Sequence, residues 1–285
     1  MRALLVLASL PVLIAPELLL ATPAHAAFSA VAAPGTGSFA AAENYDCLDP
    51  TVGFGPTLFY PFNEAAGATA VDFSGNRRNG VLGAGAARVV GSCAPGDSPA
   101  LDLSSPGAMV GTPQIVDAPT TFSLAVWFRA VPGATPGGRL LGFGDAQTGA
   151  SAQSDRHLYM TNTGGIGLGV ITRNGQSDQY KAESVVAAGP FNDGRWHLAV
   201  GTLDPVQGAA LYVDGVLMMS GKNIVAERPY KGFWRVGYDS MDVNTKKDWP
   251  GAPTDVSFRG AVDNAAVYAA VLSPAQVQSL YTGGR

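Results

Sequence analysis

The chain has 285 residues, only 14% of them charged, and it contains 36 glycines and 20 prolines. Low charge with many turn-forming residues indicates a turn-rich all-β protein and excludes a disordered chain, which needs low hydrophobicity and high net charge. The net charge is −4 and no basic stripe is present, so nucleic acid is not expected as a partner.

Residues 1–26 are typical of a secretory signal peptide. Arg2 precedes the apolar stretch ALLVLASLPVLIAPELLL, and an Ala-x-Ala cleavage signature ends at Ala26. Two prolines and a glutamate interrupt the apolar stretch, which disfavours a membrane-spanning helix. A buried N-terminal helix is the alternative. We expect a secreted, extracellular protein, free or attached to the cell surface, with no transmembrane segment in the mature chain.

Residues 27–46 are small and polar with isolated phenylalanines, and they indicate a leader or linker. The alternative is an extended strand that joins a sheet edge. Cys47 and Cys93 are the only cysteines, and an exported protein can keep them oxidised. Neither has a base nearby in the sequence to make a reactive thiol. We therefore predict a disulfide, which would stabilise the fold by roughly 4 kcal/mol in the chain-entropy model.

Short apolar runs broken by turn signals begin near Phe54. The strand candidates are residues 58–62, 87–91, 108–111, 121–130, 139–144, 157–161, 165–173, 195–203, 209–220, 233–238 and 256–268. Asp214-Gly215 and Asn174-Gly175 are each predicted to form a two-residue hairpin loop. Because no helices alternate with these runs, the pattern predicts one antiparallel sandwich.

One helix is predicted, at the C-terminal end. Ser273 can cap it and Pro274 suits the first helical position. Val277, Leu280 and Tyr281 then fall at helical spacing, so one face of the helix can pack on a sheet.

Six stretches occur in a characteristic order: FYPFNEAAGATAVDFSGNRRNG, ALDLSSPGAMV, TFSLAVWFRA, FNDGRWHLAVGTL, ALYVDGVLM and FRGAVDNAAVYAAVLSPAQVQSLYTGG. The series resembles the laminin-G-like, concanavalin A-like jelly-roll domain family of secreted bacterial proteins, over roughly residues 56–285. DRHLYM and GFWRVGYDS resemble its actinobacterial branch. The resemblance implies an antiparallel jelly-roll β-sandwich with a short C-terminal helix, over residues 47–285. It also implies binding of glycans or other extracellular partners, and often of calcium at the sandwich edge.

The turn AVDFSGNRRNG (70–80) is the candidate calcium site. Calcium binds six to eight oxygens, and Asp72, Asn76 and Asn79 could supply several. The family resemblance implies that the segment GAVDNAAVY lies near this turn, which makes Asp263 the second carboxylate. Such a calcium would be structural.

The same turn has a plainer interpretation. Asp72 can bond to local backbone amides while the asparagines adopt left-handed conformations. Relatives often carry Glu where this chain has Asn264, and Arg77 and Arg78 would repel a cation. The sequence leaves both interpretations open.

No catalytic constellation is found. A glycosidase needs two carboxylates about 5 to 9 Å apart, which on a strand predicts a Glu-x-Asp type of pair, and none is present. No Gly-x-Ser-x-Gly elbow occurs either. His197 and His157 are the most plausible bases, but both lie in strand patterns. We predict structural roles for them and a protein that is not an enzyme.

The candidate ligand site is a long polar stretch, residues 239–253, in which Trp249 has no periodic reason to occur. Together with Asp242, Asn244 and Tyr180, it could bind a glycan or surface polymer, since loops on a rigid sandwich often carry binding residues. The alternative is that Trp249 folds back as a lid on the core.

The sequence therefore predicts a secreted, non-catalytic module that binds carbohydrate or another extracellular partner. The alternative is a structural or adhesive surface protein that associates with proteins or with itself, with a glycosidase-like enzyme third. Residues 27–46 and the lack of a catalytic constellation favour the alternative.

Overall fold

The computed structural model of the chain describes residues 49–91, 99–132, 137–173, 175, 179–241 and 249–284. The predicted signal peptide, the leader at 27–46, and Cys47 and Cys93 lie outside these residues. So do Asp242 and Asn244. Within the described residues, no helix is both long enough and apolar enough to span a membrane.

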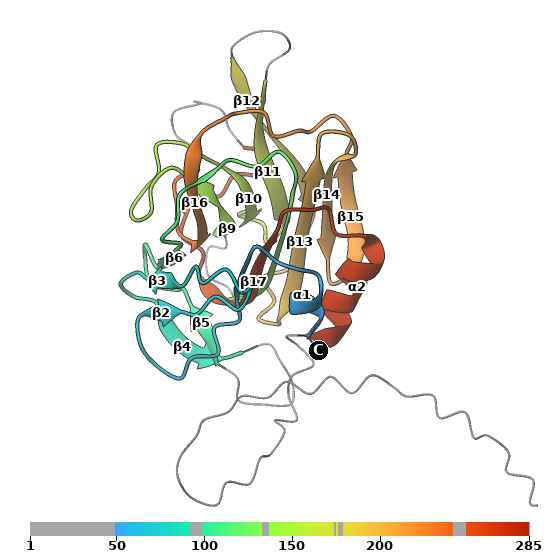
Figure 1. Ribbon diagram of the computed structural model, residues 1–285. Coiled ribbons are helices and arrows are strands. Elements are labelled where there is room, and N and C mark those ends of the chain that lie inside the picture. Colours follow the sequence, from blue (N-terminus) through green and yellow to red (C-terminus); the bar gives the residue numbers. More distant parts are fainter. Residues whose placement is uncertain are drawn as a thin grey trace, which may run out of the picture. The chain divides into compact units, whose positions relative to one another are not determined.

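Two antiparallel sheets form the fold (Figure 1), which confirms the predicted sandwich. The eight-stranded sheet has the order β15 (Val216–Gly221), β14 (Gly208–Val213), β13 (His197–Asp204), β8 (Phe122–Ala130), β17 (Gly260–Tyr268), β5 (Pro99–Asp102) and β4 (Ala87–Val90), with β1 (Leu58–Tyr60) paired to β17. The nine-stranded sheet has the order β12 (Tyr180–Ala187), β11 (Ile166–Arg173), β10 (Ser154–Met160), β9 (Gly138–Gly144), β16 (Lys231–Gly237), β6 (Met109–Gly111), β3 (Gly80–Leu82) and β2 (Thr69–Ala70), with β7 (Val116–Asp117) paired to β16.

The alternation of side chains along β8 separates the core from the outer face of the eight-stranded sheet. Leu124, Val126 and Phe128 belong to the main core cluster between the sheets. Trp127 lies on the opposite face, in a second apolar cluster. Arg129 shares that outer face, since successive side chains of a strand point to opposite sides.

The second apolar cluster packs under helix α2 (Pro274–Gly283). The short helix α1 (Asp49–Gly53) lies beside α2 (Figure 1). Ser273 caps α2 in a capping box with Gln276, which confirms the predicted start of the helix. The Tyr281 ring stacks on Trp127 with centroids 5.8 Å apart. The cluster beneath the helix includes Ala266 and Tyr268 of β17 but not Ala261, so the helix covers only part of this outer face.

One of the two predicted hairpin loops is confirmed and the other is wrong. Asp214 and Gly215 have φ values of 52° and 79°, and Val213 pairs with Val216 across them. Arg173 instead pairs with Tyr180, a register in which Asn174-Gly175 cannot be the two residues of the loop; Asn174 itself lies outside the described residues. Tyr180, the first residue of β12, packs against an apolar cluster on the nine-stranded sheet.

Candidate functional site

The turn at 70–80 is built around the buried carboxylate of Asp72, which is 7% exposed. Its Oδ1 accepts hydrogen bonds from the backbone N–H groups of Phe59, at 3.0 Å, and Ser74, at 2.9 Å. Its Oδ2 accepts from the N–H of Arg78 at 2.9 Å. Asn79 Oδ1 accepts from the Asp72 N–H at 3.0 Å. These bonds hold the turn together and join it to strand β1.

The other groups around the turn do not fit a calcium site. Asn76 Nδ2 and the Arg78 guanidinium each donate a hydrogen bond to the carbonyl oxygen of Thr57 at 3.2 Å, so the positively charged guanidinium already occupies that oxygen. Asp263, on β17, accepts from the N–H of Asn264 at 2.9 Å. Among the described residues, no group of three His, Cys, Asp or Glu side chains is arranged to hold a metal. The geometry of Asp72, Asn76 and Asn79 therefore supports the turn interpretation.

The expectation that Trp249 offers an exposed ring to a sugar is wrong. Trp249 is 2% exposed, and its Nε1 donates to the carbonyl of Met241 at 2.7 Å. Its ring lies 4.4 Å from that of His157 and packs with Tyr159, and Tyr180 lies against the same cluster. The structure brings Trp249 and Tyr180 together, but as packing residues over the outer face of the nine-stranded sheet.

A glycine and a buried ion pair also belong to this part of the nine-stranded sheet. A Cβ atom at Gly169 would lie 2.7 Å from the Trp249 ring, so the strand needs a glycine there. Arg139 and Asp239, both fully buried, form an ion pair at 2.7 Å. Burial, with the nearby charges of Arg139 and Arg228, holds the pKa of His157 well below its ordinary value. This histidine is therefore neutral and enclosed.

His197 links two turns on the other sheet. Its Nδ1 lies 2.8 Å from Asp214 Oδ2, and its Nε2 lies 3.1 Å from Asp193 Oδ1. Burial alone would lower the pKa of His197, but the hydrogen bonds and charges of the two aspartates outweigh it and raise the pKa. With the rings of Phe128 and Phe191 against it, the imidazole joins the turns as a structural group.

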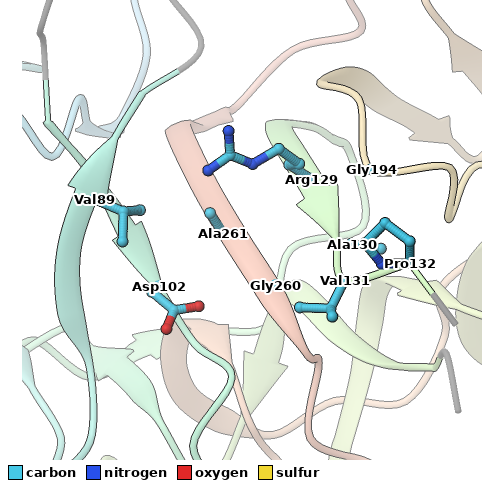
Figure 2. A pocket seen from close by; sticks show the side chains of 9 residues that line it. All are labelled: Val89, Asp102, Arg129, Ala130, Val131, Pro132, Gly194, Gly260 and Ala261. Atoms are coloured by element: carbon cyan, nitrogen blue, oxygen red, sulfur yellow. The ribbon is translucent and has the colours of Figure 1, made fainter. Parts of the chain in front are cut away.

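A hollow of about 240 Å³ opens on the part of the eight-stranded sheet that α2 leaves uncovered (Figure 2). It is lined by Val89, Asp102, Arg129, Ala130, Val131, Pro132, Gly194, Gly260 and Ala261. We call it the Arg129–Asp102 pocket. Sequence reasoning did not find it, since its residues come from four strands and two loops that are spread over the chain.

Strand register creates the pocket. Ala261 on β17 pairs with Arg129 on β8 and with Asp102 on β5. Figure 2 shows the two charged side chains on either side of the small Ala261. Two strand spacings place the Cα atoms of Arg129 and Asp102 about 10 Å apart. The methyl group of Ala261 forms a shallow floor between a cation and an anion.

Residues that do not line the pocket contact each of the two charged side chains. The Arg129 guanidinium lies over the Trp196 ring, 4.9 Å from its centroid. Asp102 Oδ1 accepts hydrogen bonds from the hydroxyl of Ser104, at 2.6 Å, and from its N–H, at 3.2 Å. The pocket thus presents a planar set of donors opposite an acceptor, which suits a small ligand rich in hydroxyl groups.

Comparison with protein families gives a match over residues 104–278 to the concanavalin A-like lectin/glucanases superfamily. The matched segment includes Arg129 and Ala261, and Asp102 lies just before it. No curated protein matches the sequence.

Solved structures with the same fold include toxin binding domains. The ligand binding domain of botulinum neurotoxin serotype D, in complex with N-acetylneuraminic acid, has a TM-score of 0.54 and 15% identity, covering 84% of this chain and 52% of that one. The botulinum neurotoxin type G receptor binding domain has a TM-score of 0.54 and 14% identity, covering 80% and 51%. A Trypanosoma rangeli sialidase with the inhibitor DANA has a TM-score of 0.50 and 19% identity, covering 79% and 32%. This chain spans about half the length of the toxin domains.

Proposed function

The chain belongs to the concanavalin A-like lectin/glucanase superfamily, and from this we propose that it is a secreted, non-catalytic module that binds carbohydrate in the Arg129–Asp102 pocket. One observation carries the proposal: Arg129 and Asp102 flank Ala261 in register, in an open pocket on the eight-stranded sheet.

The chemistry of the pocket suits a sugar. A guanidinium donates several hydrogen bonds in one plane and a carboxylate accepts them, so the two together can bind neighbouring hydroxyl groups. Charge-assisted hydrogen bonds of this kind are roughly twice as strong as neutral ones. Its volume of about 240 Å³ lies slightly below the roughly 300 to 1,000 Å³ typical of small-molecule sites. One sugar unit at the end of a glycan is therefore the expected ligand.

The structural neighbours support this proposal by analogy. The serotype D neurotoxin domain is described as a ligand binding domain and was solved with N-acetylneuraminic acid. That acidic sugar would find a suitable partner in Arg129, because arginine binds carboxylates in a planar, bidentate manner. An acidic terminal sugar is thus the first ligand to test.

Catalysis is not part of the proposal. Glycoside hydrolysis commonly uses two carboxylates across the scissile bond, and Asp102 is the one carboxylate among the residues that line the pocket. The sialidase neighbour nevertheless makes hydrolysis a reaction to measure beside binding.

Binding of the chain without residues 1–26 to an array of neutral and acidic glycans tests the proposal. We expect Arg129→Ala and Asp102→Asn each to weaken binding at least tenfold, the usual order of effect for a lost charged hydrogen bond. Arg173→Ala is the matched control, since Arg173 is exposed on the other sheet. Equal binding by the unchanged protein and all three variants would refute a binding site in this pocket. Release of free sugar would refute the proposal that the module is non-catalytic.

A further inference from the structure

Strand β15 forms one edge of the eight-stranded sheet, and among the described strands it pairs only with β14. Four successive large apolar side chains on it face solvent: Val216 is 59% exposed, Leu217 52%, Met218 38% and Met219 45%. We call these four residues the β15 patch. A continuous exposed apolar run on a sheet edge is a typical sign of an interaction surface.

The sequence of β15 does not protect this edge. Edge strands usually carry lysine, proline or inward-facing charges that prevent pairing with another chain. Val216–Gly221 contains no charged residue and no proline. Its one irregularity is a register shift at Met218, which interrupts the ladder with β14. The bulge limits backbone pairing across the edge, so a partner would be held chiefly by side-chain packing.

Charges at the two ends of the strand indicate which partner fits. Asp214 precedes β15 and Lys222 follows it. In an antiparallel arrangement about a two-fold axis, Lys222 of one copy comes near Asp214 of the other, whereas a parallel arrangement would bring like charges together. We propose that the β15 patch is the contact between two copies of this chain, packed antiparallel about a two-fold axis that passes near Met218.

This pairing goes beyond the proposed glycan binding and does not depend on it. Strands β14, β13 and β8 separate β15 from β17, so the Arg129–Asp102 pocket stays open in the pair. Four strand spacings of about 4.8 Å separate β15 from β17 in each copy, so the two pockets would lie at least roughly 40 Å apart. A pair of copies could then bind two sugars of one surface, which raises the apparent affinity without new contacts.

Sedimentation velocity of the chain without residues 1–26, over a range of micromolar concentrations, tests the pairing. We expect a dimer, and we expect the double variant Leu217→Lys, Met219→Lys to sediment as a monomer. Lys222→Glu should weaken the dimer at least tenfold, because it places two acidic groups together. Val206→Lys is the matched control: Val206 is 79% exposed, lies in the turn between β13 and β14, and should leave the dimer intact.

Circular dichroism and thermal melting establish that each variant is folded before it is compared. A monomer at all concentrations would overturn the proposal, as would a dimer that the double variant leaves unchanged. A dimer that forms only after residues 27–46 are deleted would also overturn it, since the chain's own leader would then be the occupant of the edge. Glycan binding by a monomer would refute the pairing and leave the proposed function standing.

Discussion

Arg129 and Asp102 stand directly opposite the same residue, Ala261, on the two strands that flank β17. The size of residue 261 therefore decides whether there is a pocket at all. A larger side chain at this position would fill the space between the guanidinium and the carboxylate without changing either charge.

We expect Ala261→Leu to abolish glycan binding, because the added atoms occupy the floor of the pocket. Ala261 lies on the outer face of the sheet, next to an open hollow, so the cost in stability should be below about 1.5 kcal/mol. Isothermal titration with the best glycan from the array measures the binding, and urea unfolding measures the stability. Ala270→Leu, at an exposed position, is the control. Full affinity in folded Ala261→Leu would place the ligand elsewhere.

The two histidines beyond the predicted signal peptide should titrate differently. His197 is held by two aspartates that raise its pKa, whereas His157 is enclosed and its pKa is lowered. In an NMR titration we expect one imidazole signal with a midpoint above roughly 6.5, the ordinary histidine value, and one signal that does not shift over the folded range. Two signals with ordinary midpoints would contradict the buried position of His157.

These shifts act on stability in opposite directions. His197 has a raised pKa in the folded state. Its contribution to the free energy of unfolding is therefore complete below its pKa in the unfolded chain and is lost as the pH rises through its pKa in the folded protein. His157 has a lowered pKa, so stability falls as pH drops below roughly 6.5 and the unfolded chain takes up a proton. In His197→Gln, the loss of stability on the alkaline side should disappear while the loss on the acid side remains. Urea unfolding between pH 5 and 8 measures both.

Trp249→Ala should destabilise the protein by about 3 to 5 kcal/mol, because it removes a large buried side chain and leaves a cavity over His157. Denaturant unfolding measures this loss. The folded fraction should bind glycans as the unchanged protein does, since Trp249 is not among the residues that line the Arg129–Asp102 pocket. Lost binding in a fully folded variant, with stability unchanged, would restore the sequence-based site around Trp249.

Calcium should leave the melting temperature unchanged, because Asp72 already accepts three backbone hydrogen bonds. Melting in millimolar calcium and in EDTA tests this. Asp72→Ala should lower stability by about 1 to 3 kcal/mol in both buffers, since it leaves buried amides without an acceptor. A rise of several degrees in calcium, lost in Asp72→Ala, would instead make the turn a metal site.

Features set by a few neighbouring residues could be read from the sequence. Ser273 and Pro274 begin α2 as predicted, because a cap needs only the residues of the first turn. Asp214-Gly215 forms its turn because both positions can adopt positive φ. The short apolar runs, broken by turn signals and without helices between them, predicted the sandwich, since strands of this kind need only a few neighbouring residues to be recognised.

Tertiary structure alone decided where the Arg129–Asp102 pocket lies. Trp249 stands in a polar stretch, and its burial depends on Gly169 and His157, which are about 80 and 90 residues earlier in the chain. Arg129 and Asp102 become neighbours of Ala261 only through the register of three strands. The sequence by itself determined the longer strands, the Asp214-Gly215 turn and the class of fold, because these depend on local conformation and burial pattern. The pocket required the pairing of distant strands, since a shift of one residue in β17 would turn Ala261 to the other face.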